Sequence, residues 1–96
     1  MKVRYSSAAE EEFAESALFY LEESPQAAFD FEETIDEAVS SISKDPELYP
    51  IYENGIRYKV VDTFPFSIFY RIRAGEIQIL SIAHQSRKPG YWDDRI

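Results

Sequence analysis

The sequence predicts an α+β two-layer sandwich in which an α-helical hairpin packs on an antiparallel sheet. After one short alternating segment, apolar residues recur at helical spacing through residues 7–44, and beyond Asn54-Gly55 the period changes to two. A sheet with one apolar face needs a cover, and the helical hairpin is the cover that this chain offers. We therefore expect one domain over residues 1–96, in the order strand, helix, helix and three strands (β-α-α-β-β-β).

The first half of the chain predicts one strand and two helices. Residues 2–5 alternate polar and apolar, which is typical of a short strand. Ser7 and Glu10 have the spacing of a capping box that begins a helix. Pro25 cannot continue that helix but suits the first position of a second one, capped by Ser24 and ended by Asp45-Pro46. The expected apolar stripes are Phe13, Ala14, Ala17, Leu18 and Leu21, then Ala28, Phe31, Ile35, Ala38, Val39 and Ile42.

The second half predicts a loop followed by three strands. The segment DPELYPIYENG holds two prolines and an Asn-Gly turn, which indicates a loop. Strands are expected over residues 56–60, 66–73 and 76–83, the last two joined by a turn at Ala74-Gly75. If the apolar alternates of these strands point to the helices, the free face of the sheet carries Arg57, Lys59, Arg71 and Arg73.

Composition and charge restrict the class of protein. The chain has no cysteine, which excludes disulfides, thiol nucleophiles and cysteine zinc sites. It shows neither the apolar run of a signal peptide nor the ~18 apolar residues of a membrane helix, so we expect a soluble cytoplasmic protein. The net charge of −8 divides into −11 over residues 1–55 and +3 over residues 56–96. This asymmetry indicates two surfaces for different partners, or simply the solvated faces of acidic helices.

Several residues are candidates for chemistry. The pairs Arg57/Lys59 and Arg71/Arg73 can bind phosphates of a nucleic acid or form a solvated outer face. His84 can act as a general base or close a strand, and Arg87 can hold a phosphate or brace a carboxylate. Tyr91 and Trp92 can stack on nucleobases or close the core. The sequence has no metal-ligand spacing and no Gly-rich phosphate loop, so we expect no metal and no cofactor.

The segments FPFSIFYRI and EIQILSIAHQSRKPGYWDDR resemble the C-terminal half of the RelE/ParE toxins of bacterial type II toxin–antitoxin systems. The resemblance implies a plasmid-stabilisation type of growth inhibitor with a cognate antitoxin. One branch of the family cleaves mRNA on the ribosome, and the other poisons DNA gyrase. The RNA-cleaving branch usually carries an arginine three residues before the strand tyrosine. Here that tyrosine is Tyr70 and the corresponding residue is Ser67, which favours the ParE branch.

Two alternatives stay open within this resemblance. A ribosome-dependent endoribonuclease would use Arg87 and Tyr91, which match the late arginine and tyrosine of the RNA-cleaving branch in spacing, together with His84 and Lys59. A degenerate module would bind its antitoxin without being toxic. In every case the acidic helices over residues 10–37 predict an antitoxin segment rich in Lys and Arg, because complementary charge steers association.

Overall fold

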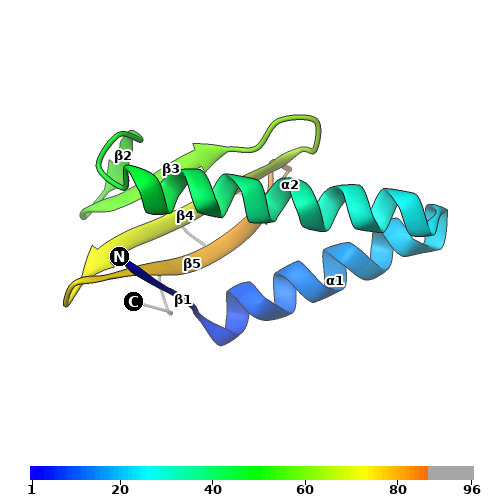
Figure 1. The fold of residues 1–96 in the computed structure, drawn as a ribbon, viewed down its shortest axis with the longest axis horizontal. Coiled ribbons are helices and arrows are strands. Elements are labelled where there is room, and N and C mark those ends of the chain that lie inside the picture. The colour runs from blue at the N-terminus through cyan, green and yellow to red at the C-terminus, as the bar shows by residue number, and fades with distance from the viewer. Residues whose placement is uncertain (87–96) are drawn as a thin grey trace.

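A five-stranded sheet and a helical hairpin form the two layers of this computed structural model, which describes residues 1–86 (Figure 1). The elements are β1 (Lys2–Tyr5), α1 (Ser7–Glu23), α2 (Pro25–Lys44), β2 (Ile51–Glu53), β3 (Ile56–Val60), β4 (Phe66–Arg73) and β5 (Glu76–His84). The strand order is β1-β5-β4-β3-β2, with β1 parallel to β5 and the other neighbours antiparallel. The predicted α+β sandwich is confirmed.

Two serines fix where the helices begin. Ser6 caps α1, because its Oγ accepts a hydrogen bond from the N–H of Ala9 at 3.0 Å, and it also donates to the carbonyl of Leu80 at 3.2 Å. The predicted capping box at Ser7 is therefore wrong by one residue. Ser24 ends α1 and begins α2, since its N–H donates to the carbonyl of Tyr20 and its Oγ accepts from the N–H of Ala27.

The main core lies between the helices and one face of the sheet. All six predicted apolar positions of α2 are buried, whereas the residues of α1 in the core are Ala9, Phe13, Ala17 and Tyr20. Leu18 and Leu21 are 60% and 47% exposed, and Ala14 is exposed too, so their prediction as core residues is wrong. One residue along a helix turns the side chain by about 100°. Leu18 and Leu21 each follow a core position by one residue and thus face away from the sheet.

The predicted loop after α2 contains a strand. Ile51 pairs with Arg57, and Asn54 and Gly55 join β2 to β3 with φ values of 50° and 75°. Two successive residues in the left-handed region are what a two-residue hairpin turn requires. The prolines at 46 and 50 favoured the prediction of a loop, so this short edge strand was missed in the sequence. The turn at Ala74-Gly75 has the same character, with φ values of 52° and 74°, and confirms the last predicted hairpin.

Candidate functional site

The four predicted basic residues do not share one face of the sheet. Arg57 pairs with Tyr70 and Lys59 with Ile68, and both partners belong to the core beneath the helices. Arg57 and Lys59 therefore lie on the helix side, and the prediction that they join Arg71 and Arg73 is wrong. The physical reason is that the apolar residues of β3, Ile56 and Tyr58, pack with Phe69 of β4 on the side away from the helices. On the face away from the helices, which we call the outer face, a second cluster is formed by Ile56, Tyr58, Phe69, Leu80 and Ala83.

Arg57 and Lys59 hold the chain segment that follows α2. The Nη1 atom of Arg57 donates hydrogen bonds to the carbonyls of Glu47 at 3.0 Å and Tyr49 at 2.7 Å. The Nζ atom of Lys59 lies 4.9 Å from the ring centroid of Tyr49, a cation–π contact. Arg57 is thus bound to backbone carbonyls, and Lys59 lies against a ring of the same segment.

The strand tyrosine Tyr70 is part of the same attachment. It is fully buried, and its hydroxyl donates to the carbonyl of Pro46 at 2.7 Å. Burial raises the pKa of Tyr70 to about 12, although Arg57 nearby acts to lower it. The phenol is therefore neutral and committed as a donor at physiological pH. Ser67 lies opposite Ala83, on the other face of β4 from Tyr70, because the two positions differ by an odd number of residues.

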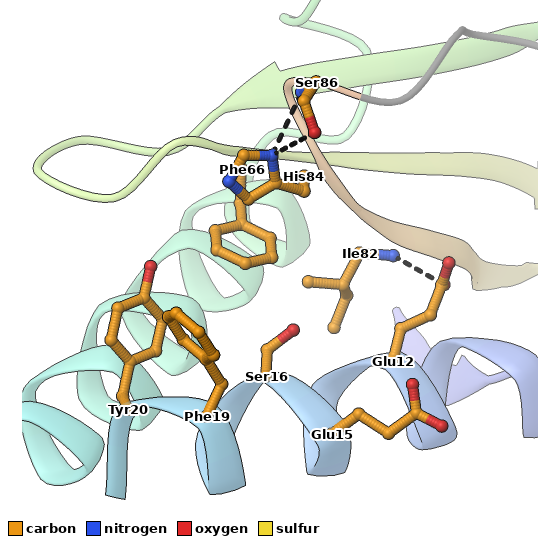
Figure 2. A pocket seen from close by; sticks show the side chains of 9 residues that line it. All are labelled: Glu12, Glu15, Ser16, Phe19, Tyr20, Phe66, Ile82, His84 and Ser86. Carbon is orange, nitrogen blue, oxygen red and sulfur yellow. Dashed lines mark hydrogen bonds between the residues drawn. The ribbon is translucent and has the colours of Figure 1, made fainter. Parts of the chain in front are cut away.

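His84 lines a cavity of about 370 Å³ between α1 and the end of β5 (Figure 2). Its ring packs edge-on against Phe66, with 5.2 Å between the ring centroids. Its Nδ1 accepts the backbone N–H of Ser86 at 3.0 Å and lies 2.8 Å from the Ser86 hydroxyl. Nδ1 is consequently the nitrogen that accepts the Ser86 N–H. The cavity walls are Glu12, Glu15, Ser16, Phe19, Tyr20, Phe66, Ile82, His84 and Ser86.

Glu12 lines this cavity and binds β5, and the sequence did not single it out. Its Oε1 accepts the backbone N–H of Ile82 and the hydroxyl of Ser81, each at 3.2 Å. β1 ends opposite Ile79, so α1 supplies a carboxylate to β5 where its strand neighbour has stopped. In the sequence Glu12 is one of three consecutive glutamates, and only the chain path distinguishes it.

Arg71 and Arg73 remain on the outer face, as predicted. The Nε of Arg71 donates to the Oε1 of Gln78 at 2.8 Å. Burial lowers the pKa of Arg71, and the positive charge of Arg73 lowers it further. Arg87, Tyr91 and Trp92 lie outside the described residues, so their proposed roles stay predictions.

Within residues 1–86, no group of three or more His, Asp or Glu side chains is arranged to hold a metal ion. None of the helices in that part of the chain is long and apolar enough to cross a membrane.

A helical hairpin on one face of a sheet with a leading N-terminal strand is the architecture that the RelE/ParE resemblance implies. A family model described as ParE toxin of type II toxin-antitoxin system, parDE, matches residues 3–89. The chain belongs to this family, and it is a toxin of a type II toxin–antitoxin system.

The structural comparison agrees. Nine chains of solved structures match, among them one described as the chromosomal ParDE TA system from P. aeruginosa. That chain has a TM-score of 0.78 and 24% sequence identity, with 88% of this chain and 95% of that chain covered. At this identity the likeness shows the fold. A search of the curated proteins finds no match.

Proposed function

We propose that this toxin stops growth in the bacterial cytoplasm by binding DNA gyrase and that a cognate antitoxin neutralises it. Family membership carries the proposal, and the arrangement around Tyr70 supports the gyrase branch. Tyr70 is buried and hydrogen-bonded to Pro46, and a serine stands at position 67. Arg57 is occupied by the carbonyls of Glu47 and Tyr49. An arginine that stabilises charge on a phosphate during RNA cleavage supplies several kcal/mol, and neither position provides one.

The surface proposed for the antitoxin is the side of the hairpin that faces away from the sheet. Leu18 and Phe29 are 60% and 57% exposed there, and Leu21 lies beside them. Together with Ala14, Ala17, Pro25, Ala28 and Glu32 they line a hollow of about 490 Å³. Exposed apolar side chains of this size are typical of a protein-binding surface. We call it the hairpin groove.

The carboxylates beside the hairpin groove indicate which kind of antitoxin segment fits it. Phe29 and Glu32 also border a second hollow with Glu33 and Asp36, so carboxylates flank the apolar residues. A helix with Leu, Ile or Val on one face and Lys or Arg at its margins satisfies both features. An antitoxin whose C-terminal segment is acidic would contradict this part of the proposal.

The second candidate is a ribosome-dependent endoribonuclease. The observation that favours it is that His84 lines a cavity large enough for a base or a sugar. In this alternative the toxin would use Arg87 and Tyr91 for cleavage, together with His84 and Lys59.

Inducible expression in a bacterial host, with and without the adjacent gene, separates these functions. Gyrase poisoning predicts filaments, a DNA-damage response and inhibition of supercoiling by micromolar purified toxin. Endoribonuclease activity predicts immediate loss of protein synthesis and mRNA cuts that vanish in Arg87→Ala and Tyr91→Phe. Normal growth and unaffected supercoiling would indicate a module that binds antitoxin without toxicity and would overturn the gyrase proposal.

A further inference from the structure

The register of three strands gathers cations that are far apart in the sequence. β1 pairs with β5, and β5 pairs with β4, so residues of all three strands align in two rows across the sheet. One row is Lys2, Glu76 and Arg73, and the other is Arg4, Gln78 and Arg71. We call these six residues the cationic rows. They contain four cations and one carboxylate, a net charge of +3.

The cationic rows lie on the outer face. Val3 and Tyr5, which alternate with Lys2 and Arg4 along β1, pack into the core beneath the helices. Side chains of successive strand residues point to opposite faces, so Lys2 and Arg4 point away from the helices. The same alternation places Arg71 and Arg73 there, because Tyr70 belongs to that core.

The single carboxylate of the rows leaves most of the positive charge uncompensated. Arg4 lies 3.5 Å from the Oε2 of Glu76, and its side chain is 61% exposed. Arg71 donates to the neutral amide of Gln78, and Lys2 and Arg73 are exposed. Arg71 and Arg73 stand two positions apart on the same face of β4, so their positive charges repel each other, and the pKa of Arg71 is lowered by burial and by Arg73. An anion bound between them would relieve that repulsion.

The neighbours of the cationic rows help to choose the class of anion. Ile56 and Leu80 of the outer cluster are only 1% and 3% exposed. They offer little apolar anchor to a peptide, whose affinity usually depends on such anchors. Phosphate backbones bind mainly through Lys and Arg and require no apolar pocket. Three of the four cations are arginines, whose planar donors match phosphate oxygens.

We propose that the cationic rows bind the phosphate backbone of duplex DNA. The choice of duplex DNA over RNA rests on the proposed function, because gyrase holds duplex DNA where this toxin would act. A toxin docked on gyrase with its acidic hairpin turned away would then contact the DNA through the outer face. The sheet separates the two charged surfaces, because the hairpin covers the opposite face and residues 7–44 carry 11 acidic residues and 1 basic residue, a net charge of −10.

The test measures binding of the purified toxin to a fluorescein-labelled duplex of about 20 bp by fluorescence anisotropy, without gyrase. Three to four phosphate contacts predict a slope of log K against log salt between about −2.7 and −3.6. Arg73→Gln should flatten the slope by about 1, and Arg71→Gln/Arg73→Gln by about 2. Lys44→Gln, which removes one exposed cation from the hairpin, is the matched control and should leave the slope unchanged.

Several outcomes would overturn the proposal. One is the absence of binding at low salt, and another is an equal effect of Lys44→Gln and Arg73→Gln. Tighter binding of polyglutamate than of duplex would identify an acidic protein segment as the ligand, and tighter binding of single-stranded RNA would identify RNA. Thermal unfolding of each variant shows whether it is still folded, so that a flatter salt dependence can be attributed to a lost phosphate contact. The anisotropy measurement contains no gyrase, so its result does not depend on whether the toxin inhibits supercoiling. DNA binding by the cationic rows and gyrase poisoning can therefore be refuted independently of each other.

Discussion

Arg57 and Tyr70 face each other across β3 and β4, and both donate hydrogen bonds to carbonyls of the segment that follows α2. Arg57 reaches Glu47 and Tyr49, and Tyr70 reaches Pro46. The pair therefore attaches the end of the hairpin to the middle of the sheet. Both side chains therefore serve the fold.

Tyr70→Phe tests this attachment. The substitution removes the bond to Pro46 and leaves a carbonyl without its donor, so we expect a loss of ~1 kcal/mol in the free energy of unfolding. Urea unfolding followed by circular dichroism measures it. Tyr58→Phe, on the outer face, is the control and should change stability by less than half as much. Equal losses in both variants would show that the Pro46 bond contributes no special stability.

Tyr70 also predicts a limit to stability at alkaline pH. The folded-state pKa is about 12 and the ordinary value is 10.0, so folding favours the neutral phenol. Its contribution is fully present below pH 10 and is lost as the pH rises toward 12. Stability measured across this range should fall less steeply in Tyr70→Phe than in the unchanged protein. Parallel pH profiles for the two proteins would contradict the assignment.

The sequence predicted elements whose pattern is local. The second helix, its cap at Ser24 and the turn at Ala74-Gly75 each depend on neighbouring residues, and each is confirmed. The faces of the sheet could not be predicted in the same way, because Ile56 and Tyr58 of β3 pack with Phe69 on the outer face and not under the helices. The pairing of β3 with β4 then decides which side Arg57 takes.

The cationic rows were predictable only in part, because half of their cations depend on which strands pair. Arg71 and Arg73 were identified from their spacing of two. Lys2 and Arg4 join them through the parallel pairing of β1 with β5, which links opposite ends of the chain. A charge count by sequence segment assigns Lys2 and Arg4 to the acidic half, although the fold places them with the basic strands.

Glu12→Ala tests the carboxylate that accepts hydrogen bonds from β5 beyond the end of β1. Without it the N–H of Ile82 and the hydroxyl of Ser81 lose an acceptor in a half-buried place, which costs about 1–3 kcal/mol. Glu15→Ala removes an exposed carboxylate from the same cavity wall and is the matched control. Hydrogen exchange should accelerate at Ile82 in the first variant alone. Unchanged exchange there would refute a role for Glu12 in closing the strand edge.

Leu18→Ala tests the hairpin groove as the antitoxin surface. Leu18 is 60% exposed and is not among the core residues of the described chain, so the variant should keep its stability and its toxicity. If a side chain of the antitoxin packs on it, affinity for the product of the adjacent gene should fall about 10-fold or more. Leu48→Ala is the matched control, since Leu48 is 65% exposed and lies away from the groove. Surface plasmon resonance compares the two. An equal affinity for both variants would place the antitoxin elsewhere, because the same atoms are removed at nearly the same exposure.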